Sequence, residues 1–312
     1  MRTTPRTALV FGGVLVVTGL LAGCSRGPFP GVGPVPTLSA GQSAVVTFCN
    51  DEQARITEPL VLHGDASTAL YIHGGDWVSG DLSTGGFAID RIGPALTARG
   101  DVVVSVDYRL GPDNLWPDQI IDVKCAVRYL RANARALHVD PDRIGVWGQS
   151  AGGQLAGLLG TAGPTAGWDV GVYPKQSSRV EAVVDLSGPS DIIGMSTSGA
   201  SGFVKDTFVK LLGPLAAAAV PGVLTDAGPV HYVAPGDPPF LIVHGDADAI
   251  VFPSQSEELA RALKGAGDSV QLVVVHGGGH ALNQPGESPD QSQIVADVVN
   301  FLSFVLDLQP AA

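Results

Sequence analysis

The chain has 312 residues, of which 45% are hydrophobic and 15% charged, so it can bury the core of a full α/β domain. Its formal net charge is −12, and it has no basic patch or aromatic–basic stripe. Nucleic acid is therefore not an expected partner. No Cys/His spacing is typical of zinc, and no loop is typical of phosphate binding, so we expect no metal and no nucleotide cofactor.

The N-terminus has the features of an export signal. Arg2 and Arg6 precede an apolar run over 8–21, which is short for a membrane span. The run ends in Leu21-Ala22-Gly23-Cys24, which resembles a bacterial lipobox. We therefore expect a signal peptide at 1–23 and a lipid on Cys24 that holds the protein on the outer face of a membrane. An ordinary cleaved signal peptide or an uncleaved anchor is the alternative.

A Gly/Pro-rich segment separates this signal from the rest of the chain. Residues 24–42 have no apolar periodicity, which predicts an extended, disordered tether before a folded domain at 43–312. That domain contains Cys49 and Cys125. In an oxidising compartment these two can form a disulfide that closes a loop of about 75 residues, or they can remain buried thiols.

Strand-like and helix-like segments alternate through the domain. We expect an antiparallel hairpin at the sheet edge, formed by 43–48 and 54–62. Beyond it, the alternation predicts a mostly parallel twisted sheet with helices on both faces. Residues 188–239 break the pattern and are expected to form a lid-like insertion. The other strands are expected at 68–72, 101–108, 143–147, 180–186, 240–244 and 270–275, and the helices at 88–98, 117–137, 154–159, 254–264 and 294–305.

One turn has the pattern of a nucleophile elbow. The run Gly148-Gln149-Ser150-Ala151-Gly152 follows an expected strand and precedes an expected helix, which is the context that gives a G-x-S-x-G match its meaning. A side chain at position 148 or 152 would clash in so sharp a turn. The helix would point its positive end at Ser150, which we expect to be a nucleophile.

A serine hydroxyl needs a base and an orienting acid, and candidates for both follow later strands. In the run 244–248, with sequence His-Gly-Asp-Ala-Asp, we expect Asp248 to be the acid because it lies one turn beyond the strand end. Asp246 is the alternative acid. His280, which follows three glycines, is the expected base, and His276 is the alternative. The histidine that opens the run 244–248 is expected to bond within its own loop.

The donors for a developing oxyanion are expected on two backbone segments. One is the N–H group of Ala151, next to the nucleophile. The others are on Gly74, Gly75 and Asp76, in a glycine-rich loop that follows the strand at 68–72. Glycine there lets backbone N–H groups face a substrate carbonyl.

Four motifs together resemble those of the α/β-hydrolase esterases, above all the feruloyl-esterase-like and hormone-sensitive-lipase-like group. The similarity covers roughly residues 43–308. It implies an α/β-hydrolase fold, a triad of Ser150, Asp248 and His280, and an oxyanion hole at 74–76 with Ala151. The motifs are His73-Gly74-Gly75-Asp76-Trp77-Val78-Ser79-Gly80, Asp107-Tyr108-Arg109-Leu110, the run 140–153 and the run 238–248.

The resemblance implies a serine carboxylesterase that acts on a small acyl-ester substrate, and the N-terminal signal predicts that it is extracytoplasmic and tethered to a membrane. An amidase or peptidase with the same triad, such as an arylformamidase, is one alternative. A catalytically silent lipoprotein that binds an acyl or aromatic ligand is another. Many relatives have a third glycine where this chain has Asp76. Only the N–H of that residue is needed, but its carboxylate would disfavour anionic substrates and shift the base's pKa.

Overall fold

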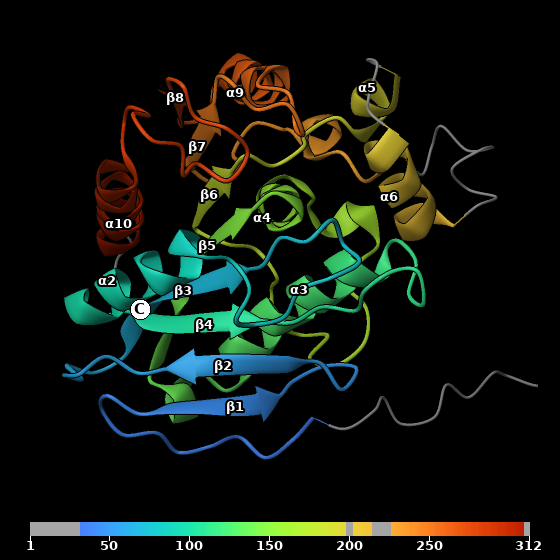
Figure 1. Cartoon of the computed structure of the whole chain (residues 1–312). Helices are drawn as coiled ribbons and strands as arrows, with labels where there is room; N and C mark the ends of the chain where they lie inside the picture. Colours follow the sequence, from blue (N-terminus) through green and yellow to red (C-terminus); the bar gives the residue numbers. More distant parts are fainter. Residues whose placement is uncertain (1–31, 198–201, 214–225, 309–312) are drawn as a thin grey trace, which may run out of the picture.

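The computed structural model describes residues 32–197, 202–213 and 226–308 (Figure 1). The predicted signal peptide at 1–23 and Cys24 lie outside the described residues. Within the described part of the chain, no helix combines the length and the apolar composition that crossing a membrane requires.

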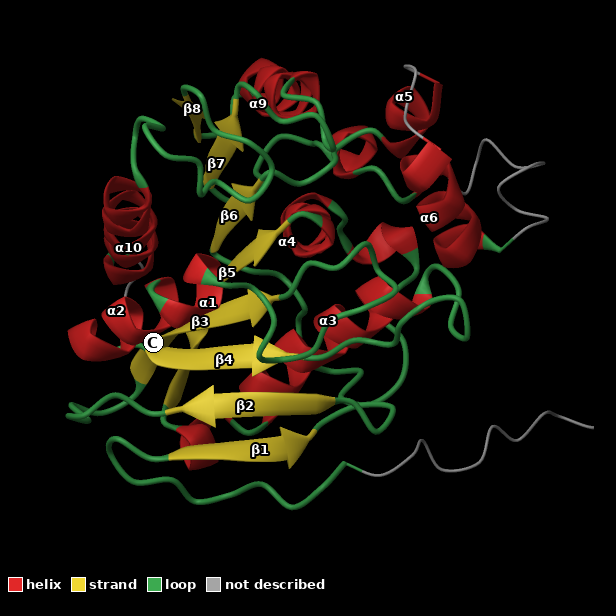
Figure 2. Cartoon of the chain, viewed as in Figure 1, coloured by secondary structure: helices red, strands yellow, loops and turns green. Residues whose placement is uncertain are grey.

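A single twisted sheet of eight strands runs through this part of the molecule (Figure 2). The strand order is β1-β2-β4-β3-β5-β6-β7-β8. β1 pairs with β2, and β2 with β4, in antiparallel fashion, and the remaining neighbours are parallel. The strands are β1 (Ser43–Thr47), β2 (Gln53–Thr57), β3 (Ala66–Ile72), β4 (Val102–Val106), β5 (Val139–Gln149), β6 (Ala182–Leu186), β7 (Phe240–Gly245) and β8 (Val270–Val275).

Helices cover the sheet on both sides, so the parallel strands are buried on two faces and are nearly continuous in apolar residues. Every residue of β4 and β6, for example, is buried. One face carries α3 (Asp118–Ala132), α4 (Ala151–Thr161) and α9 (Ser254–Ala266). The other carries α1 (Phe87–Asp90), α2 (Ile92–Arg99) and α10 (Gln291–Asp307). The expected mostly parallel sheet with two helical layers is confirmed.

Several element boundaries differ from the sequence prediction. The helix expected at 88–98 is two helices that meet at Arg91, and the second strand ends at Thr57 rather than at 62. The strand before the elbow begins earlier than expected, at Val139. In the predicted insertion at 188–239, the structure describes α5 (Ile192–Thr197), α6 (Gly202–Leu212) and a short 3₁₀ turn at Pro229–Tyr232, whereas 198–201 and 214–225 lie outside the described residues.

Part of the predicted tether packs on the domain. The backbone N–H of Gly33 donates to the carbonyl of Thr47 over 2.9 Å, which places this segment beside β1. Leu38 is buried and belongs to the core on the α3 side of the sheet. Residues 32–42 are therefore ordered against the domain, and the prediction of a disordered tether through residue 42 is wrong for them.

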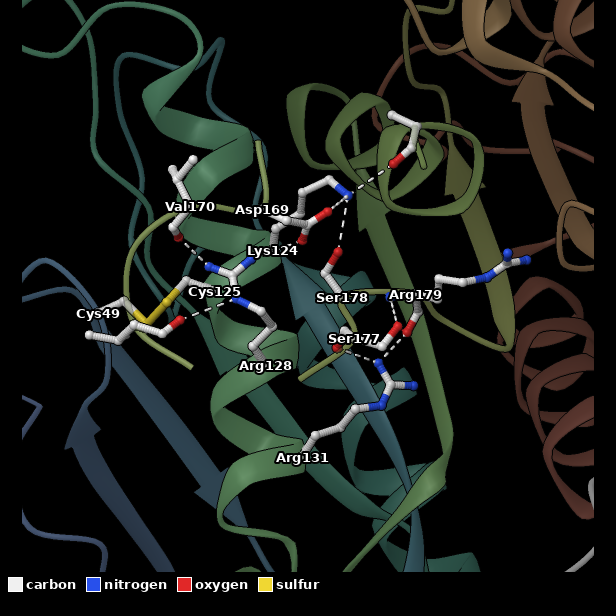
Figure 3. Close-up of polar contacts among 12 residues, drawn as sticks. Cys49, Lys124, Cys125, Arg128, Arg131, Asp169, Val170, Ser177, Ser178 and Arg179 are labelled. Atoms are coloured by element: carbon white, nitrogen blue, oxygen red, sulfur yellow. Dashed lines mark hydrogen bonds and ion pairs between the residues drawn. A yellow bond between two sulfur atoms is a disulfide. The ribbon is translucent and has the colours of Figure 1, made fainter. Parts of the chain in front are cut away.

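α3 buries charged as well as apolar side chains. Its apolar face packs on the sheet, as the periodicity predicted, but Lys124 and Arg128 are also almost completely buried. Figure 3 shows their cationic ends among the oxygens of a covering segment. Lys124 Nζ lies 2.9 Å from the carbonyl oxygen of Ala162, and Arg128 Nη1 lies 2.9 Å from Asp169 Oδ1. This segment, 162–179, encloses the side of α3 that faces away from the sheet.

Cys49 and Cys125 form a disulfide in this structure, with Cα atoms 6.3 Å apart (Figure 3). Cys49 lies in the turn between β1 and β2, and Cys125 lies in the middle of α3. Next to the bond, Asn50 Nδ2 donates to Asp122 Oδ1 over 2.7 Å. The disulfide therefore connects the antiparallel edge of the sheet to the helical layer.

Candidate active site

Ser150 lies in a sharp turn between β5 and α4, with φ 57° and ψ −121°. Positive φ is unfavourable for a residue with a side chain, and such strain is concentrated at functional sites. The turn is also tightly packed. A Cβ at Gly148 would overlap the carbonyl of Gly152, and one at Gly152 would overlap the carbonyl oxygen of Ile72 in β3. The prediction that both positions require glycine is confirmed.

His280 lies between the hydroxyl of Ser150 and the carboxylate of Asp248. Its Nε2 is 2.9 Å from Ser150 Oγ, and its Nδ1 is 2.7 Å from Asp248 Oδ2. The three side chains come from loops after β5, β7 and β8, at the carboxyl edge of the parallel sheet. The structure therefore brings together the expected nucleophile, base and acid, which are far apart in the sequence.

The carboxylate of Asp248 is completely buried and held by several donors. Its Oδ1 accepts the backbone N–H groups of Ile250 and Val251, at 2.8 and 3.0 Å. Burial alone would raise the pKa of Asp248, but hydrogen bonds from His244 and His280 outweigh it and hold the pKa well below its usual range. Asp248 is therefore ionised and can stabilise a protonated His280.

The alternative acid and base form a separate pair. Asp246 Oδ2 lies 2.9 Å from His276 Nδ1, and Asp246 Oδ1 accepts the N–H of Gly277 over 2.7 Å. The side chains of His276 and Asp246 are 76% and 42% exposed. The structure places neither of them in contact with Ser150.

The loop at 74–76 passes directly over the nucleophile. A Cβ on Gly74 would lie against the backbone carbonyl of Gln149 and the side chain of Ser150. Gly75 and Asp76 have positive φ values, 110° and 58°. Within the described residues, the N–H groups of Gly75, Asp76 and Ala151 donate no hydrogen bond. They are free to bind an oxyanion beside Ser150.

His73 and Tyr108 contact each other at the start of this loop and hold it in place. The Tyr108 hydroxyl donates to the carbonyl of His73 over 3.0 Å, and the two rings stack with centroids 4.2 Å apart. Both residues are buried. On the other side of the loop, Trp77 Nε1 donates to Gln154 Oε1 of α4 over 2.9 Å. The loop is therefore fixed both to the segment that follows β4 and to α4.

A small cavity of about 20 Å³ opens at Ser150, with space for roughly one water-sized group. Asp76 contributes to its wall; burial raises the pKa of this carboxyl, opposed by the charges of His280 and Lys210. A larger cavity of about 450 Å³ lies between α2 and the strands β2 and β4, and contains none of the site residues. The other residues around the small cavity are Trp77, Pro189, Met195, Thr207, Phe208, Ile250 and Val251.

Sequence reasoning missed three residues of this site. His244 was expected to bond within its loop, and it does so through Val251, but its Nε2 also lies 3.2 Å from Asp248 Oδ2. The roles of Tyr108 and Gln154 depend on contacts between distant segments. Only the four-residue spacing from His244 to Asp248 is a local signal, and it suggests that the two side chains can meet.

Two family models match parts of this chain, and several of the known proteins that it resembles are esterases. The BD-FAE family model matches residues 56–263, and the prolyl oligopeptidase family model matches residues 221–308. Esterase LipC of Mycobacterium tuberculosis is 32% identical over 70% of this chain and 53% of its own length. Carboxylesterase NlhH of the same organism is 34% identical over 45% of this chain and 43% of its own. The chain thus spans about half the length of the curated relatives it matches.

Solved structures show the same fold. A truncated carbohydrate esterase from gut microbiota has a TM-score of 0.73 and 27% identity, covering 88% of this chain and 99% of its own. Esterase 2 of Thermogutta terrifontis with propionate bound has a TM-score of 0.68 and 25% identity, covering 89% of this chain and 98% of its own. The chain therefore has the α/β-hydrolase fold and belongs to the BD-FAE family.

Proposed function

We propose that the protein is a serine carboxylesterase in which Ser150, His280 and Asp248 form the catalytic triad. The observation that carries this proposal is the position of His280, whose two ring nitrogens lie 2.9 Å from Ser150 Oγ and 2.7 Å from Asp248 Oδ2. The esterase names of its relatives support the same reaction class.

In the proposed reaction, Ser150 Oγ attacks the acyl carbon while His280 Nε2 takes the hydroxyl proton. Asp248 stabilises the resulting imidazolium. The free N–H groups of the 74–76 loop and of Ala151 bind the oxyanion, and the N-terminus of α4 adds its positive end. His280 then gives the proton to the leaving alcohol. A water molecule, deprotonated by His280, hydrolyses the acyl-enzyme.

The cavity at Ser150 supports a short acyl group in the substrate. With a volume of about 20 Å³ it has space for roughly one water-sized group, about the size of a methyl. A longer chain would have to displace Phe208, which lines the cavity from α6. We therefore expect acetyl and propionyl esters to be hydrolysed faster than octanoyl esters, in a panel with one leaving group.

The test of the proposal is labelling by a fluorophosphonate probe together with hydrolysis of p-nitrophenyl acetate. The wild type should label and hydrolyse, and Ser150→Ala should lose labelling and at least about 10³-fold in kcat/KM. Ser83→Ala removes an exposed hydroxyl and is the matched control, which should behave as the wild type. A folded wild type that neither labels nor hydrolyses would favour the silent binding protein.

One observation favours an amidase or peptidase as a second candidate. The prolyl oligopeptidase match covers residues 221–308, the region that supplies both Asp248 and His280. Hydrolysis of p-nitroacetanilide separates the two candidates: an amidase should cleave this anilide in a reaction that Ser150→Ala abolishes, and an esterase should leave it intact while hydrolysing p-nitrophenyl acetate. We expect a strong preference for the ester.

We also propose that the protein is exported and anchored in the membrane by a lipid on Cys24, on the basis of the sequence Leu21-Ala22-Gly23-Cys24. The disulfide between Cys49 and Cys125 supports an oxidising compartment. Metabolic labelling with an alkyne fatty acid tests this: wild-type protein should incorporate label, and Cys24→Ala should not.

A further inference from the structure

We infer that His244 is a positioning residue for the triad: its Nε2–H group holds Asp248 in place and draws off part of the negative charge that Asp248 presents to His280. The inference rests on the proposed esterase function. It concerns a buried histidine that does not contact Ser150 and takes no part in the reaction as described above.

The contacts of His244 define which nitrogen carries the hydrogen. Nε2 lies 2.8 Å from the carbonyl oxygen of Val251 and 3.2 Å from Asp248 Oδ2. A carbonyl can only accept, so Nε2 carries the hydrogen and donates it to Val251, with Asp248 Oδ2 beside the same N–H group. Nδ1 lies 2.6 Å from Ser256 Oγ, on α9. The Ser256 hydroxyl can donate to Nδ1 or accept from it, so the carbonyl of Val251 is the contact that places a hydrogen on Nε2.

His244 and His280 both lie against the same carboxylate oxygen. Asp248 Oδ2 is 2.7 Å from His280 Nδ1 and 3.2 Å from His244 Nε2. The His244 side chain is only 2% exposed and that of Asp248 is fully buried, so no solvent can replace a lost donor. Without His244, Oδ2 would keep one partner, and the carboxylate could rotate away from the position that orients His280.

The charge of Asp248 also depends on its donors. Each N–H that binds a carboxylate delocalises its negative charge, so removing His244 makes Oδ2 a stronger partner for protonated His280. A higher pH is then needed before His280 can act as a base. The other groups whose charge acts at these histidines are Asp76, beside His280, and Asp185, on β6 near His244. Both stay unchanged in the variants below.

The test uses three variants and the pH dependence of p-nitrophenyl acetate hydrolysis between pH 5 and 9. His244→Phe removes the donor and retains a ring. His244→Gln places an amide N–H where Nε2 stood. Ser256→Ala disturbs the same buried histidine but leaves its Nε2–H, so it is the matched control for packing damage.

In His244→Phe we expect kcat to fall about 10-fold, KM to stay within about twofold, and the acidic limb of kcat/KM to move up by about half a pH unit. In His244→Gln and Ser256→Ala the acidic limb of kcat/KM should stay at the pH of the wild type. A folded His244→Phe with the wild-type kcat and limb would overturn the inference. So would a fall in kcat with an unmoved limb, or a His244→Gln as impaired as His244→Phe.

A measurement on the wild type covers the case in which His244→Phe does not fold. A ¹⁵N spectrum of histidine-labelled protein should show the His244 ring protonated at Nε2, assigned by its loss in His244→Gln. A ring unprotonated at Nε2 would overturn the inference. The spectrum does not depend on catalytic activity. An inactive wild type would therefore reject the proposed function, while the spectrum would still test whether His244 presents an Nε2–H group to Asp248.

Discussion

At Ser150 the backbone can adopt its strained turn only because the neighbouring positions have no side chains. Gly152→Ala would bring a Cβ into the carbonyl oxygen of Ile72, which is backbone and cannot rotate away. We expect this change to destabilise the fold by about 1–3 kcal/mol and to lower esterase activity by moving the nucleophile. Denaturant unfolding and ester hydrolysis measure the two effects.

The matched control for that prediction is Gly265, an exposed helical glycine in α9. A Cβ there meets no atom within 4 Å, so Gly265→Ala should leave activity unchanged and add about 0.5–1 kcal/mol of stability. Equal behaviour of the two alanine variants would contradict the steric account of the elbow.

Asp185 is a buried carboxyl near the end of β6. Burial raises its pKa to about 6, and the N–H of Gly188, at 2.8 Å, opposes the rise only in part. Its pKa is thus higher in the folded than in the unfolded chain, so ionisation of Asp185 destabilises the fold above about pH 6. That penalty disappears as the pH falls below the unfolded pKa.

Asp185→Asn should therefore stabilise the protein at pH 8 by up to about 3 kcal/mol and have little effect at pH 4. Asparagine keeps an oxygen that can accept from Gly188, so the turn should survive. Denaturant unfolding at the two pH values measures the difference, with the exposed Asp113→Asn as the control. A gain of equal size at both pH values would show that the charge of Asp185 is not the cause.

The residues of the site differ in how far a sequence can predict them. Ser150, Asp248 and His280 each follow a strand within a short motif, and the structure places them in contact. Asp246 also follows the strand, but the spacing from His244 favours Asp248, and in the structure Asp246 pairs with His276 at the surface. Local spacing thus indicated the acid, whereas the pairing of Asp246 with His276 depends on how two loops pack.

At the scale of elements, the sequence predicts strands and helices where burial produces a regular spacing of apolar residues. It does not predict the residues at which they end. The run 88–98 has one continuous helical pattern, but the helix breaks at Arg91. α3 shows a second limit. Its periodicity marks the face that meets the sheet, whereas the burial of Lys124 and Arg128 depends on a segment about 40 residues away in the chain.

The burial of Lys124 leads to a stability prediction. Its Nζ donates to the carbonyl of Ala162 over 2.9 Å and to Ser178 Oγ over 3.0 Å, and it lies 3.4 Å from Asp169 Oδ2 (Figure 3). Lys124→Met keeps the volume but leaves these oxygens without a donor. We expect a loss of about 3 kcal/mol in the free energy of unfolding.

Lys264→Met, on the exposed side of α9, is the control for that measurement and should change stability by less than about 0.5 kcal/mol. If Lys124→Met were as stable as this control, the buried ammonium would contribute nothing to holding the segment 162–179 on α3. Asp169 retains Arg128 as a partner in the variant, which limits the expected loss.

At the scale of the whole molecule, the two edges of the sheet are stabilised differently. β7 and β8 are followed by the loops that carry Asp248 and His280, and α9 packs on this end. The opposite edge ends in the antiparallel pair β1 and β2. A disulfide between Cys49 and Cys125 attaches that pair to α3, across a sequence separation of 76 residues. The sequence alone does not show whether these two cysteines form a disulfide, because it does not give the distance between them in the fold.

Closing so long a loop restricts the unfolded chain more than the folded one, and the chain-entropy model assigns about 4 kcal/mol to it. The double variant Cys49→Ala/Cys125→Ala should therefore lose roughly that free energy of unfolding and unfold at a lower denaturant concentration, with a larger slope because its unfolded chain is less compact. Adding a reductant should lower the midpoint of the wild type toward that of the variant and leave the variant where it is. If both proteins respond equally to the reductant, or if the variant is as stable as the oxidised wild type, the crosslink does not stabilise this edge, and the packing of β1 and β2 on the core suffices.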